Sequence, residues 1–412
     1  MLPSLKPPTA NSQLPTASSG AVRTSAVDLG VGRWELGVHS ETTTVECIAD
    51  PAEFAALGPQ WNELLRASAA DNPFLTWEWL HSWWIHLRES AGLRLFVVRS
   101  GDELIAIAPM RLVNSALYWF SRLEFLGTGH AGSDYLDLIV RRGHEAQALA
   151  ALGRYFTANQ VAMRFNHLAP SSLAARLAEQ AAVDGWTSTI ADDGTCPVIP
   201  LAGLTFDGYL ATLGSSHRAN FRRRLKALGQ QFELRFDQVT AHRERCDMLA
   251  ALIAFHERRW KEQGGSSAFI TPAVVAFQDE VTRRALESGW LRMYVLRLNG
   301  ETAAVMYGFN YGGRFYFYQH GFDDKYKAHS VGLVLMGLTI RAAIEEGAGE
   351  FDMLWGVEPY KFLWARDART LQRVELFPIH FGGTVQRHAL EARRNVKNLA
   401  RRVLSIGESR GS

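Results

Sequence analysis

Residues 326–364 read YKAHSVGLVLMGLTIRAAIEEGAGEFDMLWGVEPYKFLW, and this stretch decides which fold we expect. A turn of small residues, 327–332, precedes an apolar run with helical periodicity, and a strand pattern begins at Glu350. The first turn of a helix leaves backbone N–H groups without partners, and the helix dipole adds partial positive charge there. The segment therefore predicts a site for a cofactor that carries a diphosphate.

The turn approximates the spacing Arg/Gln-x-x-Gly-x-Gly/Ala, with Lys327, Ser330 and Gly332 in the defined places. Small residues in such a turn let the backbone approach phosphate oxygens closely. We expect His329 and Leu333 to belong to the same cofactor-binding turn. The alternative is an ordinary helix start capped by the Ser330 side chain, which is worth about 1 kcal/mol.

Composition places the chain among ordinary soluble proteins. Its 412 residues exceed the usual size of one hydrophobic core, so we expect two domains. A net charge of +2 is too small to demand a nucleic-acid or membrane partner, and no apolar run is long enough for a membrane span. Cys47, Cys196 and Cys246 have neither metal-ligand nor disulfide spacing. We therefore expect a cytoplasmic protein without a metal.

One pattern occurs twice along the chain, in residues 93–110 and 291–308. Each copy reads as an apolar strand, a polar turn that contains glycine, and a second apolar strand, which is the pattern of a β-hairpin. Each copy follows a helical stretch that carries one tryptophan, Trp61 or Trp260. This ordered repetition indicates a duplicated domain.

The repeat sets the expected domain organisation. Residues 1–43 are rich in Pro, Ser, Thr and Ala and read as a disordered leader, and residues 386–412 read as a basic helical tail. The two copies span 44–200 and 201–385. Strands alternate with helices in both, which predicts the α/β class, with a mixed, mostly antiparallel sheet flanked by helices in each domain. The expected helices are 50–67, 76–89, 144–158, 171–184, 217–229, 243–262, 272–288 and 331–347.

Two further segments make a family resemblance specific. The ending FDMLWGVEPYKFLWA at 351–365 and the basic helix SSHRANFRRRLK at 215–226 resemble the GNAT superfamily of acyl-CoA transferases. The nearest resemblance is to the tandem-GNAT branch shared by FemABX-type peptidyltransferases and CelD-like acetyltransferases of bacterial exopolysaccharide and cellulose gene clusters. The resemblance covers roughly 45–385. It implies two fused GNAT-like domains and acetyl-CoA as co-substrate. The implied acceptor is an amine or hydroxyl, such as an amino sugar or a polysaccharide precursor.

A polar cluster follows the strand at Glu350. Acyl transfer needs a base for the acceptor and an acid, or water, for the departing thiolate. Glu358 or Asp352 is a candidate base and Tyr360 a candidate acid, but Glu358 and Lys361 are also spaced to form a salt bridge. His320, at the end of the aromatic strand 315–320, is a second candidate base, with a hydrogen-bonded structural histidine as the alternative.

Substrate binding is expected of residues near this cluster and on the basic helix. Arg218 and Arg222 lie four residues apart on one helix face, where they could bind CoA phosphates or an acidic acceptor, or could simply face solvent. Gln319 and Lys361 are the remaining substrate-binding candidates. The tryptophans of the segment 76–84 are expected to pack in the core or between domains.

The second copy is expected to be catalytic because it carries the diphosphate turn. The first copy has a glycine-rich stretch at 127–132 that is too irregular for a cofactor site, so we expect a structural or acceptor-binding role. The rival hypotheses are a FemABX-type aminoacyl transferase and a non-catalytic scaffold subunit of exopolysaccharide biosynthesis. The near-neutral charge disfavours a nucleic-acid partner, and a homodimer is possible.

Overall fold

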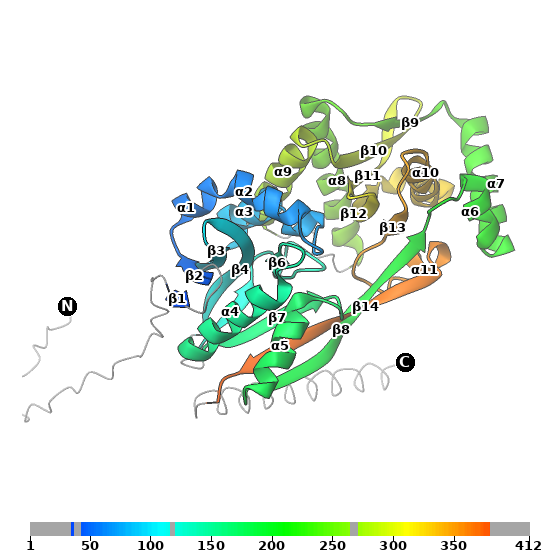
Figure 1. Cartoon of the computed structure of the whole chain (residues 1–412). Coiled ribbons are helices and arrows are strands. Elements are labelled where there is room, and N and C mark those ends of the chain that lie inside the picture. The colour runs from blue at the N-terminus through cyan, green and yellow to red at the C-terminus, as the bar shows by residue number, and fades with distance from the viewer. Residues whose placement is uncertain (1–33, 37–42, 116–119, 264–270, 380–412) are drawn as a thin grey trace, which may run out of the picture.

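The computed structural model describes residues 34–36, 43–115, 120–263 and 271–379 (Figure 1). Across these residues the strands form one 14-stranded sheet in the order β1-β2-β3-β4-β5-β7-β14-β8-β13-β12-β11-β10-β9, with β6 beside β4. Most neighbours are antiparallel, and helices flank the sheet in both parts of the chain. The predicted α/β class is confirmed.

We refer to the elements from β1 to β8 as the first half. Its strands are β1 Trp34–Leu36, β2 Thr43–Ile48, β3 Gly92–Ser100, β4 Glu103–Ser115, β5 Phe120–Phe125, β6 Ile139–Val140, β7 Ala162–Leu168 and β8 Thr187–Pro200. Its helices are α1 Pro51–Ala56, α2 Gly58–Arg66, the 3-10 turn η1 Pro73–Leu75, α3 Trp77–Leu87, α4 Glu145–Asn159 and α5 Leu173–Val183.

The elements from α6 to β14 form the second half. Its helices are α6 Phe206–Thr212, α7 Ser215–Gln231, α8 His242–Gln263, α9 Pro272–Glu287, the 3-10 turn η2 Asp324–His329, α10 Val331–Glu345 and α11 Lys361–Trp364. Its strands are β9 Leu234–Gln238, β10 Leu291–Leu298, β11 Glu301–Tyr311, β12 Arg314–Phe322, β13 Glu350–Asp352 and β14 Asp367–Phe377.

The predicted elements agree with the structure, with two kinds of exception. Both hairpins are present, as β3–β4 and β10–β11, with Gly101 and Gly300 at positive φ in the turns. The expected helix 50–67 is two helices that meet at Leu57, because a second helix starts there with Pro at its first turn. The short helices α6 and α11 were not predicted.

From β2 to β8 and from β9 to β14, the two halves run through a similar order of elements, which agrees with the predicted duplication. In each, helices and a hairpin lead to a pair of parallel strands, β5 with β7 and β12 with β13. The last strands are exchanged: β8 pairs with β13, and β14 pairs with β7. β8 and β14 also pair with each other from Asp367↔Val198 to Phe377↔Thr187, and Figure 1 shows them as two long arrows between the halves. Such an exchange joins the halves through main-chain hydrogen bonds.

Side-chain packing adds to this junction. Helix α3 packs against α9, and the buried Trp79 ring meets Phe277 at 5.2 Å and Phe309 at 5.7 Å between ring centroids. Trp83 is also buried. The predicted packing role of these tryptophans is confirmed.

The two ends of the chain were expected to be a leader and a basic tail. Strand β1 and Thr43, the first residue of β2, fall inside the stretch 1–43, and the rest of that stretch lies outside the described residues. The tail 386–412 lies outside them as well. None of the helices within the described ranges combines the length and apolar character needed to cross a bilayer.

Candidate active site

An opening between two parallel strands defines the site in the second half. β12 and β13 pair at Arg314↔Glu350, Phe315↔Phe351 and Tyr316↔Asp352, where β13 ends while β12 continues to Phe322. The two strands therefore separate after Tyr316 and Asp352.

A β-bulge in β12 lies next to this opening. Tyr307 of β11 is opposite Gln319 and Gly308 is opposite Phe317, so Tyr318 is an extra residue. Bulges bend a strand and redirect its backbone groups. A side chain at Gly308 would overlap the carbonyl oxygen of Tyr316, so this close approach requires glycine.

The turn after β12 leads directly into α10. Ser330 adopts a left-handed conformation, with φ 57° and ψ 41°, and its side chain makes no capping hydrogen bond. The alternative of a helix capped by the Ser330 side chain is therefore wrong. A Cβ atom on Gly332 would lie 3.3 Å from the Phe322 ring, so the turn is tightly packed on that side. The helix start presents the dipole and amide groups that bind phosphate.

The arginine of α7 that contacts this turn is Arg224, whereas Arg218 and Arg222 were expected to do so. Arg224 Nη1 donates to the carbonyl oxygen of Ala328 at 3.2 Å, and its buried Nε has no hydrogen-bond partner in the structure. Arg218 instead donates to the carbonyls that end α6, Leu210 at 3.4 Å and Ala211 at 3.2 Å.

Arg222 and the turn residues have contacts of their own. Arg222 pairs with Asp207 at 3.0 Å. The His329 ring lies edge-on to Phe232, with 5.1 Å between ring centroids, and the carbonyl oxygen of Lys327 accepts from Ser330 N at 3.2 Å. Phosphate binding by Arg218, Arg222, Lys327, His329 and Leu333 remains a prediction.

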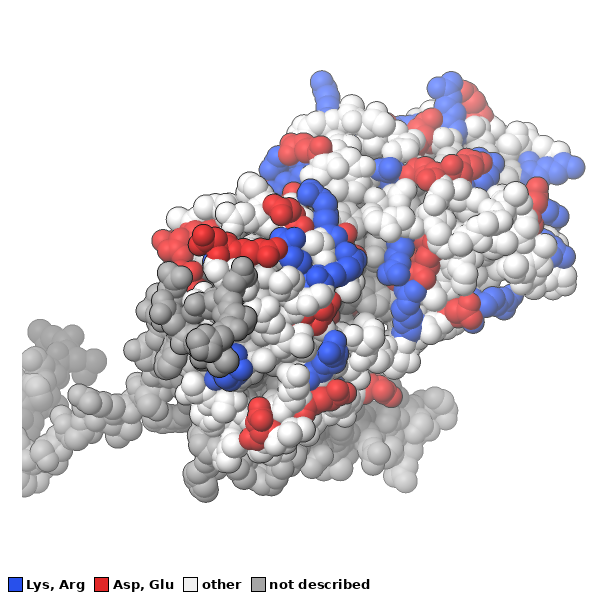
Figure 2. Space-filling view, in the orientation of Figure 1, with Lys and Arg blue, Asp and Glu red and all other residues white. Residues whose placement is uncertain are grey.

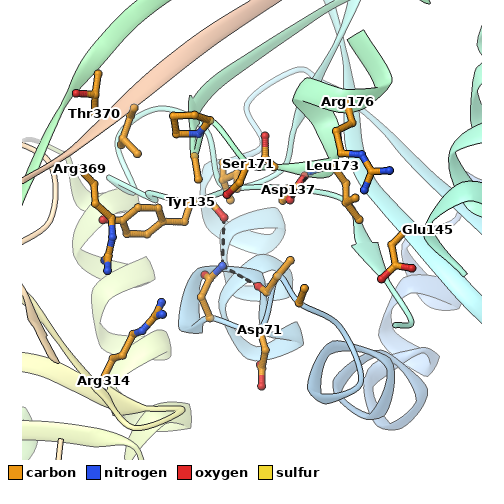
Figure 3. Close-up of a pocket in the computed structure, with 18 of the residues that line it drawn as sticks. Asp71, Tyr135, Asp137, Glu145, Ser171, Leu173, Arg176, Arg314, Arg369 and Thr370 are labelled. Carbon is orange, nitrogen blue, oxygen red and sulfur yellow. Dashed lines mark hydrogen bonds between the residues drawn. The ribbon is translucent and has the colours of Figure 1, made fainter. Parts of the chain in front are cut away.

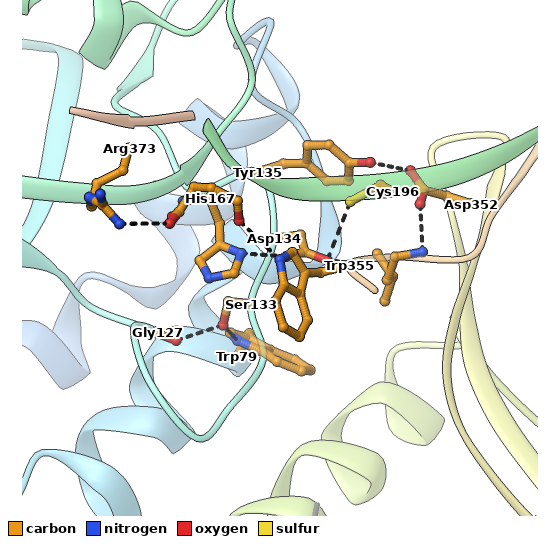
Figure 4. A network of polar contacts seen from close by, with 12 residues as sticks. Trp79, Gly127, Ser133, Asp134, Tyr135, His167, Cys196, Asp352, Trp355 and Arg373 are labelled. Atoms are coloured by element: carbon orange, nitrogen blue, oxygen red, sulfur yellow. Dashed lines mark hydrogen bonds and ion pairs between the residues drawn. The ribbon is translucent and has the colours of Figure 1, made fainter. Parts of the chain in front are cut away.

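Asp352 stands at the point where the strands separate. Its carboxylate is fully buried and accepts a hydrogen bond from Tyr135 OH at 2.6 Å, which Figure 4 shows. It also accepts from Leu354 N at 2.8 Å and from Arg369 Nη1 at 3.2 Å. Burial raises the pKa of Asp352 to about 6, although the hydrogen bond from Tyr135 lowers it. A carboxylate with such a pKa is suited to general base catalysis near neutral pH.

Glu358 and Lys361 form the ion pair that their spacing allows. Glu358 Oε2 lies 3.2 Å from Lys361 Nζ, and the Glu358 side chain is 53% exposed. Lys361 is buried and also donates to the carbonyls of Leu354 at 3.2 Å and Trp355 at 2.8 Å. Lys361 therefore fixes the backbone that follows β13.

The remaining predicted residues lie on or near β12. The rings of His320 and Tyr360 are 5.4 Å apart between centroids, and the carbonyl oxygen of His320 is 3.0 Å from His256 Nε2. Gln319 lies at the bulge, opposite Tyr307. The structure thus brings His320, Gln319 and Tyr360 to the same end of β12, and their chemical roles remain predictions.

The glycine-rich loop of the first half reaches this region, which was not predicted. Tyr318 OH donates to the Ala131 carbonyl at 2.5 Å, and Trp355 N donates to Asp134 Oδ2 at 2.7 Å. The buried Asp134 also lies 3.1 Å from His167 Nδ1, and Figure 4 shows these groups beside the Tyr135–Asp352 contact. Residues 127–137 thus form one wall of the region. In the sequence, only the polar residues within this glycine-rich stretch could have indicated that it lines the site.

A cavity of about 640 Å³ opens between the halves (Figure 3). Its walls come from the loops 69–72, 135–137 and 169–173 of the first half and from β12 and β14 of the second. Three arginines and three carboxylates line it: Arg176, Arg314, Arg369, Asp71, Asp137 and Glu145. Tyr135 and Tyr316 also line it and connect it to Asp352. The turn residues 327–333 do not.

Asp137 shows that a lining carboxylate can be purely structural. It is buried and accepts from Leu138 N, Leu173 N and Ala174 N, two of which begin α5. Burial raises the pKa of Asp137 to about 6, while these backbone hydrogen bonds lower it. Nowhere in the described ranges do three or more His, Cys, Asp or Glu side chains gather closely enough to hold a metal ion.

The comparisons with known proteins agree with this geometry. Residues 215–362 match the family described as an acetyltransferase (GNAT) domain. No curated protein sequence matches the chain.

Solved structures share the fold across both halves. FemX is 8% identical and aligns over 78% of this chain and 96% of its own, with a TM-score of 0.58. The C-terminal domain of a putative lysylphosphatidylglycerol synthetase from Agrobacterium fabrum is 10% identical over 82% and 95%, with a TM-score of 0.51. A conserved protein of unknown function from Bacteroides thetaiotaomicron is 12% identical over 80% and 99%, with a TM-score of 0.50.

Proposed function

We propose that this protein transfers an acetyl or other acyl group from acyl-CoA to an amine or hydroxyl acceptor. The observation that carries the proposal is the opening between β12 and β13 beyond Tyr316 and Asp352, next to a helix start that no side chain caps. An extended thioester donor fits such an opening, with its diphosphate at the start of α10. The GNAT match of residues 215–362 supports acyl transfer.

The donor is held from two sides in this proposal. Backbone amides of 331–333 and the dipole of α10 bind the diphosphate, and Arg224, whose Nη1 contacts the Ala328 carbonyl, places a further positive charge beside the turn. The thioester then lies beside the bulge at Tyr318. Redirected main-chain N–H groups there stabilise the oxyanion of the tetrahedral intermediate.

The acceptor occupies the cavity between the halves and reaches the thioester past Tyr135. Its nitrogen or oxygen attacks the carbonyl carbon while Asp352 receives the proton. Collapse of the intermediate breaks the C–S bond, and Tyr360 or water protonates the thiolate. Much of the rate comes from holding the two substrates together. By resemblance, the acceptor is an amino sugar or a polysaccharide precursor.

Calorimetric titration with acetyl-CoA tests the donor site. Gly332→Glu places a carboxylate where we expect the diphosphate, and should weaken binding at least about tenfold, since like charges are brought together. A glutamate in the first turn of a helix is favourable for the helix itself, although the Phe322 ring, 3.3 Å from the new Cβ atom, must shift slightly. The matched control is Gly229→Glu in α7, where a side chain meets no neighbour within 4 Å.

Equal affinities of Gly332→Glu and Gly229→Glu for acetyl-CoA would contradict the proposed position of the diphosphate at the start of α10. Circular dichroism on both variants must show native helix content. If the wild-type protein binds no acyl-CoA, the proposal fails.

Aminoacyl transfer is the second candidate function. The shared fold with FemX supports it, together with five cationic side chains and no acidic one on α7. The calorimetry separates the candidates, because an aminoacyl transferase of the FemABX type has no need of free acyl-CoA. The third possibility, a scaffold, predicts neither donor binding nor turnover.

A further inference from the structure

The base of the proposed reaction does not itself reach the cavity between the halves. Asp352 is completely buried, and the cavity walls include Tyr135 and Arg369 but not Asp352 (Figure 3). These two residues donate to the same carboxylate oxygen, Oδ2, from Tyr135 OH at 2.6 Å and from Arg369 Nη1 at 3.2 Å. A proton that leaves an acceptor in the cavity must therefore pass one of them to reach Asp352.

Of these two side chains, only Tyr135 can pass a proton on. An arginine guanidinium has N–H donors and no acceptor, and it stays charged in proteins. The hydrogen bond with Glu350 raises the pKa of Arg369 further. A phenol both donates and accepts, so Tyr135 can give its hydrogen to Asp352 while its oxygen accepts from a second group. Arg369 supplies only a positive charge beside that path.

The backbone around this contact has an unusual conformation. Seven non-glycine residues in the described part of the chain have a positive φ, and three of them lie here: Tyr135 at 58°, His167 at 54° and Leu354 at 55°. Tyr135 N donates to the His167 carbonyl at 3.0 Å, and Leu354 N donates to Asp352 Oδ1 at 2.8 Å. Residues with a Cβ atom seldom adopt this conformation, and those that do cluster at functional sites. The strain therefore indicates that the Tyr135–Asp352 contact has a function.

Charged side chains surround both the cavity and Asp352. Figure 2 shows acidic and basic side chains where the two halves meet. The groups that face Asp352 from the neighbouring elements are Tyr135 and Asp134 of the loop 127–137, Tyr316 of β12, Cys196 of β8 and Arg369 of β14. Burial and the charge of Asp352 raise the pKa of Tyr135 well above its ordinary value, so a free phenolate does not form. The phenol can therefore accept a proton only while it gives its own to Asp352.

We infer that Tyr135 is a catalytic residue that relays the proton of the acceptor to Asp352. This step rests on the acyl transfer proposed above. As the acceptor nitrogen or oxygen forms its bond to the thioester carbonyl carbon, its N–H or O–H bond breaks and the proton goes to Tyr135 Oη. The O–H bond of Tyr135 breaks in the same step, and that proton goes to Asp352 Oδ2. Tyr135 is neutral before and after the step, and Asp352 ends as the carboxylic acid.

Thiol release from acetyl-CoA, with glucosamine as the acceptor, tests the relay in the full chain. Tyr135→Phe removes only the hydroxyl and should lower kcat about 100-fold, as Asp352→Asn does, because one path is cut at either place. The double variant should be no slower than either single variant, since both groups serve one transfer. Tyr311→Phe is the matched control. It removes the hydroxyl of another tyrosine–aspartate pair at the cavity wall, Tyr311–Asp71 at 2.8 Å, and should keep the wild-type kcat.

The pH profile separates a relay from a merely structural role. The hydrogen bond from Tyr135 lowers the pKa of Asp352, so Tyr135→Phe should move the acidic limb of kcat to higher pH in either case. At about pH 9 Asp352 is ionised with or without the tyrosine, and a residue that only adjusted this pKa would no longer matter. The relay predicts that Tyr135→Phe stays slow there. A wild-type rate of Tyr135→Phe at this pH overturns the relay.

Two further measurements use the wild type alone. In mixtures of H2O and D2O, kcat should fall along a curve with the deuterium fraction, because two protons move in one step. A straight line, which a single moving proton gives, overturns the relay. Calorimetry with acetyl-CoA reports separately on the donor site. Binding without thiol release overturns the relay alone, whereas a wild type that binds no acetyl-CoA overturns the proposed function itself.

Discussion

At the scale of single residues, two carboxylates near the end of β13 have opposite environments. Asp352 is buried, contacts Tyr135 and Arg369, and has its pKa raised to about 6 by burial. Glu358 is half exposed and paired with Lys361. The sequence alone left both as candidate bases. Burial and the link to the cavity now favour Asp352.

Kinetics of two isosteric variants separate these carboxylates. Asp352→Asn should lower kcat about 100-fold with little change in acyl-CoA affinity, because a general base is lost. Glu358→Gln should change kcat far less. In the wild type, kcat/KM should fall as the pH drops below about 6, where Asp352 becomes protonated. A larger loss in Glu358→Gln, or an unchanged acidic limb in Asp352→Asn, would assign the base elsewhere.

At the scale of elements, α10 is placed by close packing. Gly337 of α10 lies against the Phe221 ring of α7, where a Cβ atom would overlap it, so the two helices approach closely. The corresponding helix of the first half, α4, also contains a glycine, Gly153, whose Cβ would meet only Leu177 at 4.0 Å.

Replacing these two glycines by alanine should change the free energy of unfolding in opposite directions. Gly337→Ala should lower the free energy of unfolding by about 1–3 kcal/mol, since it overpacks a close contact. Gly153→Ala should raise it by about 0.5–1 kcal/mol, because alanine restricts the unfolded chain and favours the helix. Urea unfolding of both variants measures the difference. Stabilisation by both substitutions would show that α7 does not pack closely on α10.

At the scale of the whole molecule, the two halves depend on each other. The exchanged strands β8 and β14 join them through the sheet, and Asp134 of the first half accepts from Trp355 N of the second. The same carboxylate faces His167. Burial lowers the pKa of His167, but the Asp134 carboxylate, 3.1 Å from His167 Nδ1, outweighs burial and raises that pKa above 6.5.

Stability should therefore depend on pH through His167. A raised pKa means that folding favours the protonated imidazole, so this contribution is complete below pH 6.5 and is lost as the pH rises through the folded-state pKa. The other charged groups at this place are Asp193 and Arg373, which pair at 3.3 Å. Urea unfolding between pH 5 and 9 should show this loss in the wild type and not in His167→Gln. If the stability of the wild type and of His167→Gln depends on pH in the same way, the His167–Asp134 pair is not the source of that dependence.

Local patterns predicted much of this architecture from the sequence. Glycine turns between apolar runs marked both hairpins, and helical periodicity placed α10 and its neighbours. The exchange of β8 and β14 could not be predicted, because either strand fits its own half equally well by pattern. For the same reason Arg224 was missed: its contact with Ala328 depends on how α7 rotates against α10. The role of residues 127–137 depends on contacts between the halves.

The central claim is that the second half holds an acyl-CoA at the turn between β12 and α10. Hydrogen–deuterium exchange with and without saturating acetyl-CoA tests it most directly. We expect slower exchange for the backbone amides of 329–333 and of the bulge at 318–320, with no such change in the glycine-rich stretch 127–132. Protection confined to 127–132, or no protection anywhere, would contradict it.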